Sequence, residues 1–367
     1  MPDHTRLPTY FIGHGGVSIL FKPGYGPVQD ELRQIGREIH GLRPEAIVVV
    51  SGHHQSENLG VVEINLKEPT KVWHDLGPSW KNTYPHVFEY EYPHQSSRAL
   101  GEQVLQHLQG HGIRAEGVER DLDHGIWVPF KLMFPEGSPE ELINVPILQV
   151  SSFAEDDYAA HVELGRALAR LPGRILIVGS GMLCHNLRAT RESTDLTVVK
   201  AIETAALQIL ETTPQTTQGL TEAFLQLPRR PDWPLAHPTV EHVLPLYVTL
   251  GAAEEIESAQ GKEGLEEGDV ESWNRNQYIV EEIRELFGKH VGLMMTWMTG
   301  SGLIWKNIYQ REGPSSWNQI RAFLLHIYMT PERNASVYLR YVTCAQLVKD
   351  SHNRSKLLHS LVPFSDQ

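Results

Sequence analysis

The sequence predicts an α/β fold with a mostly parallel or mixed central sheet flanked by helices, and an extra C-terminal tail of unclear structure. Two observations support this class. Several short runs of the chain are continuously apolar, as expected for strands buried on both faces of a sheet. Segments with apolar residues at helical spacing lie between these runs, and such an alternation is typical of a largely parallel sheet.

Each element rests on its own pattern. The predicted strands are residues 9–12, 46–50, 146–150 and 174–178, all rich in Val, Ile and Leu and followed by turn residues. The predicted helices are residues 28–41, 96–110, 161–171 and 238–251. The last of these helices has Pro238 in its first turn and Gly251 at its end, the positions that these residues favour.

The composition excludes several classes of partner. The 367 residues include 32 Lys and Arg against 45 Asp and Glu, a formal net charge of −13. Non-specific binding of nucleic acid or anionic lipid needs clustered positive charge, so neither is expected. The longest weakly polar stretch, residues 291–305, is too short for a membrane span, which needs roughly 20 apolar residues.

The N-terminus lacks the pattern of a secretory signal. The two cysteines, Cys184 and Cys344, cannot form a disulfide framework, which favours a reducing, cytoplasmic location. Changes in composition and patterning along the chain divide it into three parts. We expect a folded domain over residues 1–253, an acidic linker or solvated helix over 254–290 and a C-terminal extension over 291–367 in which we find no motif.

Histidines follow three of the predicted strands. The chain contains 19 histidines, and His14, His53 and His185 each come after an apolar run and one or more glycines. In an open parallel sheet, ligands bind beyond the carboxyl ends of the strands, so neighbouring strands would bring these imidazoles into one crevice. Neutral imidazole is the commonest metal-ligating side chain, and the pattern therefore predicts a metal site with an open position for water or substrate.

A further metal ligand is expected near residues 237–242. His237 and His242 are five residues apart, about 140° around a helix axis, so both cannot face one point if both are helical. We favour His242, placed inside the predicted helix, with Glu241 and His237 as competing candidates. Residues 122–129, which include Asp123, His124 and Trp127, are interpreted as a tight turn that carries function.

Other chemistries fit less well. The glycines after residue 178 lack the third glycine of a dinucleotide-binding fingerprint, because position 184 is cysteine. The sequence has no Walker A lysine pattern and no G-x-S-x-G nucleophile elbow.

Taken together, the histidine segments resemble the class III extradiol ring-cleavage dioxygenases of the protocatechuate 4,5-dioxygenase type, and within them the DOPA-4,5-dioxygenase-like branch. The resemblance covers about residues 7–253. The five segments that carry it occur in the order of the family: residues 11–15 (FIGHG), 51–53 (SGH), 122–129 (LDHGIWVP), 179–188 (GSGMLCHNLR) and 237–253 (HPTVEHVLPLYVTLGAA).

This resemblance implies an extradiol dioxygenase that opens the ring of a catechol-type substrate with O2, with DOPA as one candidate. It implies one divalent metal held by His14, His53 and His242. The metal would be Fe(II) for ring cleavage or Zn(II), as is often found in relatives. His185 would be the acid/base group, His124 would line the site and orient substrate or oxygen, and His237 is expected to contribute to substrate binding.

The sequence departs from the family pattern at three places. His54 stands where the branch commonly has tryptophan, residues 73–78 match the substrate loop only in part, and a long unrelated segment follows residue 253. Two other functions therefore stay open: a zinc-dependent hydrolase using the same histidines, and a non-enzymatic binding protein like the Memo proteins. The expected partners are a small aromatic substrate and O2, and self-association into a homo-oligomer also stays open.

Overall fold

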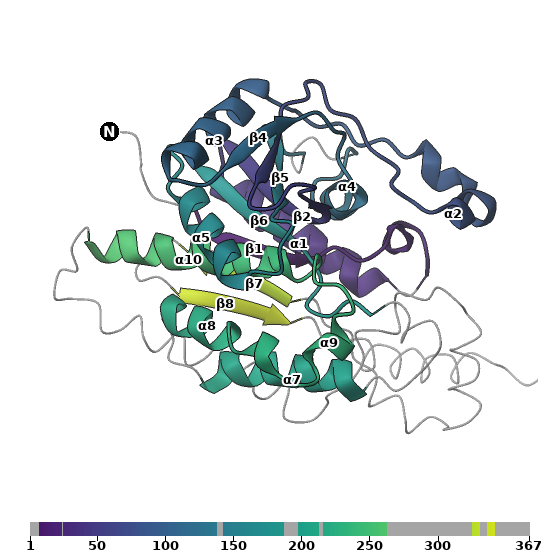
Figure 1. Ribbon diagram of the computed structural model, residues 1–367. Coiled ribbons are helices and arrows are strands. Elements are labelled where there is room, and N and C mark those ends of the chain that lie inside the picture. Colours follow the sequence, from purple (N-terminus) through teal and green to yellow (C-terminus); the bar gives the residue numbers. More distant parts are fainter. Residues whose placement is uncertain are drawn as a thin grey trace, which may run out of the picture.

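The computed structural model describes residues 7–23, 25–137, 142–186, 197–212, 216–262, 325–330 and 336–341. A six-stranded sheet forms its centre (Figure 1). In spatial order the strands are β1 (Thr9–Gly13), β6 (Ile175–Gly181), β2 (Ala46–Gln55), β5 (Ile147–Ser152), β3 (Val62–Asn65) and β4 (Ala115–Val118). Strands β1, β6, β2 and β5 are parallel, whereas β3 pairs antiparallel with β5 and parallel with β4, so the predicted mixed sheet is confirmed.

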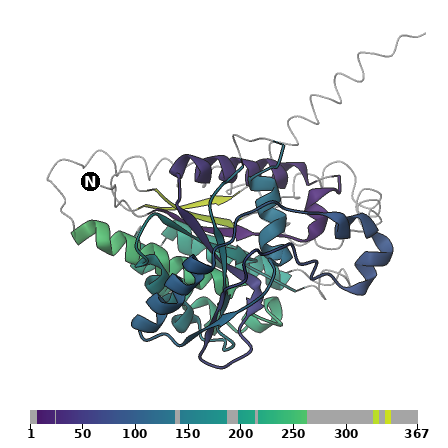
Figure 2. The same cartoon turned by 90° about the horizontal axis from the view of Figure 1, so that it is seen from above.

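Helices cover both faces of this sheet, as predicted. They are α1 (Gly26–Leu42), α2 (Pro78–Thr83), α3 (Arg98–Gly110), α4 (His124–Met133), α5 (Tyr158–Ala169), α7 (Thr197–Thr212), α8 (Thr217–Phe224), α9 (Trp233–Ala236) and α10 (Leu244–Lys262), with short 3-10 helices at η1 (Val17–Leu20), η2 (Pro85–Glu89) and η3 (Leu227–Arg229). Figure 2 shows α1 (purple) and α10 (green) on different sides of the strands.

The alternation of side chains along β2 explains the two layers. Ile47 and Val49 pack in one cluster with α1 and α4, whereas Val48 and Val50 pack in another with α3, α5 and α10. Successive side chains of a strand point to opposite faces, so a continuously apolar strand contributes side chains to the hydrophobic clusters on both faces of the sheet. This is the physical reason why unbroken apolar runs predicted the strands correctly.

Two helices differ from the prediction. Residues 122–129 are not a tight turn, because α4 begins at His124 and runs through Met133. The helix expected from residue 238 begins instead at Leu244, with Pro245 in its first turn, where a residue without an N–H is tolerated. His242 therefore lies in the turn before α10 and not inside a helix.

The end of the domain also differs in detail. Helix α10 does not end at Gly251 as predicted but continues to Lys262, into the segment interpreted as an acidic linker or solvated helix. Residues 263–290 lie outside the described residues, as do residues 187 and 188 of the fourth motif. Of the C-terminal extension, the structure describes one antiparallel hairpin against β1, made of β7 (Leu325–Thr330) and β8 (Ser336–Tyr341).

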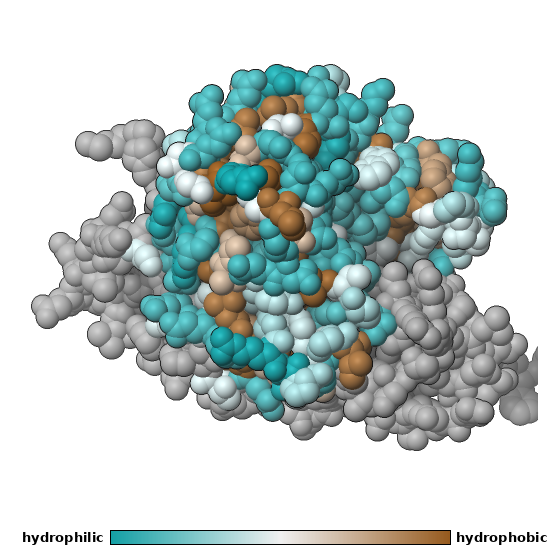
Figure 3. Space-filling model, viewed as in Figure 1, coloured by the Kyte–Doolittle hydropathy of each residue, from teal (hydrophilic) through white to brown (hydrophobic). Residues whose placement is uncertain are grey.

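The surface of the described residues is mostly hydrophilic, as expected for a sequence with many charged residues. On the face drawn in Figure 3, most of the coloured surface is hydrophilic. Only Leu59, Trp73 and Leu235 are large, exposed apolar side chains among the described residues. In this part of the chain, none of the helices has the length and apolar character needed to cross a membrane.

Candidate metal centre

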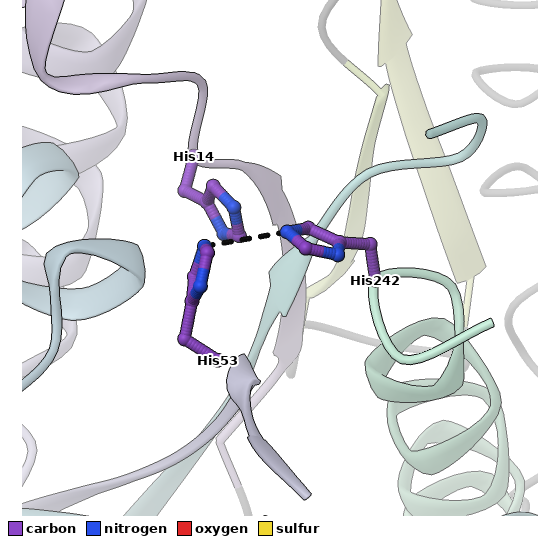
Figure 4. Close-up of side chains that lie close together, drawn as sticks. All are labelled: His14, His53 and His242. Carbon is purple, nitrogen blue, oxygen red and sulfur yellow. Dashed lines mark hydrogen bonds between the residues drawn. The ribbon is translucent and has the colours of Figure 1, made fainter. Parts of the chain in front are cut away.

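Three histidines meet at the edge of the sheet where β1, β6 and β2 end. His14 follows β1, His53 lies near the end of β2, and His242 lies in the turn before α10. One ring nitrogen from each lies within 4.8 Å of the other two. Figure 4 shows the three rings pointing toward one another. The adjacency of β1, β6 and β2 explains how positions far apart in the sequence come together.

The spacing of the ring nitrogens suits a bound cation. The Nε2 atoms of His53 and His242 are 3.3 Å apart. Two ligands that are each 2.0–2.1 Å from one tetrahedral ion lie about 3.3–3.4 Å from each other. The distance therefore matches one edge of a coordination tetrahedron.

The tautomer of His14 also favours coordination. Ser180 donates its single hydroxyl proton to the carbonyl oxygen of Gly125. The hydroxyl oxygen must then accept a hydrogen bond from His14 Nδ1, which lies 3.0 Å away. In neutral His14 the lone pair is consequently on Nε2, the nitrogen opposite this anchor.

His242 is held in the same way. Its Nδ1 lies 2.8 Å from Glu241 Oε1 and donates to that carboxylate, so its lone pair is on Nε2. A carboxylate behind a ligating imidazole fixes the ring orientation and makes the ligand more basic. Glu241, a competing ligand candidate in the sequence, thus contacts His242 from behind.

Burial keeps these imidazoles neutral. His14 is 1% exposed and His242 is 5% exposed. Burial lowers the pKa of His14 well below its usual value, and the neighbouring His242 and His124 lower it further. Burial is also the main cause that lowers the pKa of His53 and of His242. Neutral imidazole is the form that binds metal, so the donor set is ready for a cation without deprotonation.

Glycines let the segment of His242 approach the sheet. A Cβ on Gly181 would lie 2.0 Å from the carbonyl oxygen of His242, and a Cβ on Gly52 would lie 3.0 Å from its Cα. The same carbonyl accepts a hydrogen bond from Met182 N at 2.7 Å. Gly52 in β2 and Gly181 at the end of β6 are therefore required by close backbone approach.

Two further histidines border the three. His185 stacks on His242 with ring centroids 3.6 Å apart. Burial, followed by the effect of His242, lowers the pKa of His185 to about 3. The ring of His124 lies 3.9 Å from that of His53 and 6.0 Å from that of His14. All five histidines that the sequence placed at the centre are thus neighbours.

Comparison with known proteins agrees with this geometry. Residues 11–272 match the family described as the catalytic LigB subunit of aromatic ring-opening dioxygenase. The chain is 29% identical over 275 residues to 4,5-DOPA dioxygenase extradiol of Beta vulgaris, covering 74% of this chain and 96% of that protein. It is 31% identical over 276 residues to a 4,5-DOPA dioxygenase extradiol-like protein of Schizosaccharomyces pombe (68% and 86%). It is 29% identical over 256 residues to 4,5-DOPA dioxygenase extradiol of Escherichia coli K12 (68% and 86%).

The chain belongs to the LigB family. The match spans well over half of the chain and all five histidines of the centre. This confirms the resemblance inferred from the motifs, and with it the predicted enzyme class of ring-opening dioxygenases. The cluster of His14, His53 and His242 is consistent with the metal site of LigB dioxygenases.

One side chain beside the histidine cluster, Asp75, was not among the predicted site residues. Asp75 Oδ2 lies 2.9 Å from His124 Nδ1 and 3.8 Å from His53 Nδ1. The sequence of residues 73–78 matches the family's substrate loop only in part. The only available signal was a lone aspartate within that loop, and its partner is 49 residues away in the sequence.

A buried network fixes the start of α4 beside the centre. Asp123 is fully buried and accepts hydrogen bonds from Ser51 Oγ at 2.7 Å and Gln149 Nε2 at 2.5 Å. Together with the bond from Ser180 to Gly125, this network holds the first turn of α4, which carries His124. The interpretation of this segment as functional fits its place, although its conformation is helical.

His237 lies apart from the three-histidine cluster. Its Nε2 is 2.7 Å from the carbonyl oxygen of Leu183 and its Nδ1 is 3.1 Å from that of Trp233, on whose ring it stacks. Its contribution to substrate binding stays a prediction. His54, the departure from the branch pattern, is buried and donates from Nε2 to Glu63 Oε2 at 3.0 Å.

Proposed function

We propose that this LigB protein is a metal-dependent extradiol dioxygenase that opens the ring of a catechol with O2, and that His14, His53 and His242 hold the metal. The convergence of three imidazole nitrogens is the observation that carries this proposal. The lone pair on His242 Nε2 faces His53 Nε2 at 3.3 Å, and a cation between these two nitrogens would use both as ligands once His53 carries its proton on Nδ1.

The donor set fits Fe(II), the metal that ring cleavage calls for, and Zn(II) is the other candidate. When bound, a divalent iron supplies Lewis acidity that lowers the pKa of the catechol hydroxyls, and a redox centre at which O2 and catecholate react side by side. Three neutral imidazoles leave the positive charge of such a site undiminished, which favours an anionic catecholate.

His185 is the proposed acid/base group. Its ring stacks on His242, and Nδ1 lies 3.7 Å from Glu241 Oε1. Because burial lowers its pKa to about 3, the imidazole of His185 is neutral at physiological pH and carries a ring-nitrogen lone pair. We propose that this lone pair accepts the proton of a catechol hydroxyl that a bound metal would acidify. It would return this proton to the oxygenated product, so that the residue ends each cycle as it began.

The reaction balances without another co-substrate. One carbon–carbon bond beside a hydroxyl-bearing carbon breaks, and both atoms of O2 enter the product. One oxygen appears in a carboxylate and one in an aldehyde. The substrate supplies the electrons that reduce O2. His124 would orient the substrate or O2 in this step.

The relatives support a particular substrate. The three proteins compared above carry names that refer to 4,5-DOPA dioxygenase extradiol activity. We therefore propose DOPA as the first candidate, together with other catechols that carry a side chain para to one hydroxyl.

Oxygen uptake tests the function directly. Protein loaded anaerobically with Fe(II) is mixed with DOPA, other catechols, and tyrosine as a matched control that lacks one hydroxyl. We expect O2 consumption with a catechol and none with tyrosine, and both atoms of ¹⁸O2 in a ring-opened product. Absence of uptake with every catechol would refute the proposal. Hydrolysis by zinc-loaded protein would instead support a hydrolase on the same site.

A further inference from the structure

Asp75 makes two hydrogen bonds to a single residue. Its Oδ1 accepts from the backbone N–H of His124 at 3.0 Å, and its Oδ2 accepts from the ring Nδ1 of His124 at 2.9 Å. The side chain of Asp75 is only 8% exposed. A carboxylate at the first N–H of a helix is also favoured by the helix dipole, so α4 itself helps to hold Asp75 in place.

The segment that carries Asp75 is fixed to the segment before α4. Val72 forms a parallel bridge with Leu122, and Trp73 N donates to Leu122 O at 2.8 Å. Trp127 of α4 donates in turn from Nε1 to Trp73 O at 3.1 Å. These contacts hold the segment of Asp75 in a fixed position beside the start of α4. The fold itself therefore brings Asp75 to His124.

The pairing determines which nitrogen of His124 carries the proton. An ionised carboxylate can only accept, so Nδ1 must donate and Nε2 of neutral His124 keeps the lone pair. The ring of His124 packs against that of His53, at the border of the metal centre. His124 therefore presents a proton acceptor on a ring beside the place where a substrate would bind.

The geometry separates this role from metal binding. Asp75 Oδ2 is 3.8 Å from His53 Nδ1, which is too long for a hydrogen bond, whereas the bond to His124 is short. His53, Asp75 and His124 do lie close enough together to be considered as a cation site. Each oxygen of the Asp75 carboxylate already accepts a hydrogen bond from His124, so its position is explained without such a cation.

We propose that Asp75 is a positioning residue, which fixes His124 in the Nδ1–H tautomer so that Nε2 accepts a hydrogen bond from a hydroxyl of the bound catechol. The inference rests on the proposed dioxygenase function for its substrate. It adds to that function a specific requirement: the loop of residues 73–77 must be in place for His124 to orient the hydroxyl.

The decisive variant is Asp75→Asn. The amide has one oxygen for the N–H of His124, and its NH2 group then faces Nδ1. Nδ1 must become an acceptor, and the proton moves to Nε2. We expect kcat to fall at least tenfold, with iron content and thermal stability close to those of the parent. Asp121→Asn is the matched control, because Asp121 holds the same segment through Lys71 N at 2.7 Å without contacting His124.

Nitrogen NMR of the zinc-loaded, ¹⁵N-histidine-labelled protein reads the tautomer directly, with His124→Gln to assign the signals. We expect a protonated Nδ1 in the parent protein and a protonated Nε2 in Asp75→Asn. A protonated Nε2 in the parent would overturn the proposal, even if the variant does not fold. This measurement is independent of turnover, so a parent protein that consumes no O2 would refute the dioxygenase function and leave the tautomer to be judged separately.

A double-mutant cycle tests whether Asp75 acts through His124. In the His124→Gln background, we expect Asp75→Asn to have no further effect on kcat. A further loss of tenfold or more in that background would contradict the proposal. Loss of metal from Asp75→Asn to the extent seen in a ligand variant would assign the carboxylate to the cation instead, and would also contradict it.

Discussion

His53 and His242 face each other through their Nε2 atoms, 3.3 Å apart, although they are separated by 189 positions in the sequence. One comes from a strand of the sheet and the other from the turn before α10. His14 completes the cluster from the end of β1, which β6 separates from β2 in the sheet. We propose that these three side chains share one cation.

Removal of one imidazole should abolish metal binding. We expect His14→Ala, His53→Ala and His242→Ala each to reduce the metal content from about one ion per chain to nearly none, since two imidazoles hold a divalent ion weakly. Metal analysis of protein purified without added metal measures this. His111→Ala changes an exposed histidine just after the end of α3; this control should keep the metal. Full metal retention in any of the three variants would remove that residue from the ligand set.

His185→Ala should separate chemistry from binding. Because His185 stacks on a ligand without belonging to the three converging nitrogens, we expect the variant to keep its metal. Loss of a general acid/base group typically lowers kcat by roughly 10²–10⁴-fold. Oxygen uptake under saturating catechol, with metal content measured on the same sample, tests both statements. Equal loss of metal would show that the assigned role is wrong.

Glu241→Ala should weaken metal binding without abolishing it. The carboxylate holds His242 Nδ1, and loss of such a partner typically costs about 10–100-fold in metal affinity. Competition with a chelator of known affinity measures the metal dissociation constant of each variant. Glu222→Ala removes an exposed carboxylate that accepts a hydrogen bond from Gln218, and serves as the matched control. Unchanged affinity in Glu241→Ala would mean that His242 needs no such support.

Gly181→Ala should destabilise the fold at the centre. The new methyl group would lie 2.0 Å from the carbonyl oxygen of His242, so the turn before α10 must move. We expect a loss of about 1–3 kcal/mol in the free energy of unfolding, together with weaker metal binding. Gly41→Ala is the control, because its Cβ would meet nothing within 4 Å and alanine favours a helix. Denaturant titration of both variants distinguishes these outcomes.

The pair of His54 and Glu63 should make stability depend on pH. The hydrogen bond from His54, helped by Glu57 N, lowers the pKa of Glu63 from 4.5 to about 2. A folded-state pKa below the unfolded value adds stability that is present above about 4.5 and is lost as the pH falls toward 2.

We therefore expect Glu63→Gln to lower the free energy of unfolding at pH 6 by up to a few kcal/mol, and to flatten its decline between pH 4.5 and 2. Glu116→Gln, on the partner position of the adjacent strand, is the matched control. If the free energy of unfolding of Glu63→Gln falls as steeply with pH as that of the parent protein, Glu63 is not the source of this pH dependence.

The convergence of His14 and His53 could be predicted because both lie near the carboxyl ends of strands. A continuously apolar run ends at Ile12 shortly before His14 and another ends at Val50 shortly before His53, and the parallel order of β1, β6 and β2 brings such positions to one edge. His242 was chosen correctly as a member of the cluster but placed in a helix. Two prolines, Pro238 and Pro245, both suit a first helical turn, and the helix begins at the second.

Other elements could not be predicted for identifiable reasons. Helix α4 contains Pro129 and is buried on nearly all sides, so it shows no periodic polar face. Strands β3 and β4 are four residues long, and β4 is largely exposed, so neither gives a run of apolar residues long enough to recognise. Asp75 depends on a contact with His124 that no local pattern encodes.

The shared cation itself is tested most directly by a crystal structure of metal-loaded protein, with anomalous diffraction recorded at the absorption edge of the metal. We predict one strong peak at about 2.0–2.2 Å from the Nε2 atoms of His14, His53 and His242. A peak at any other group of side chains, or three rings without a peak between them in protein that contains one equivalent of metal, would contradict the account.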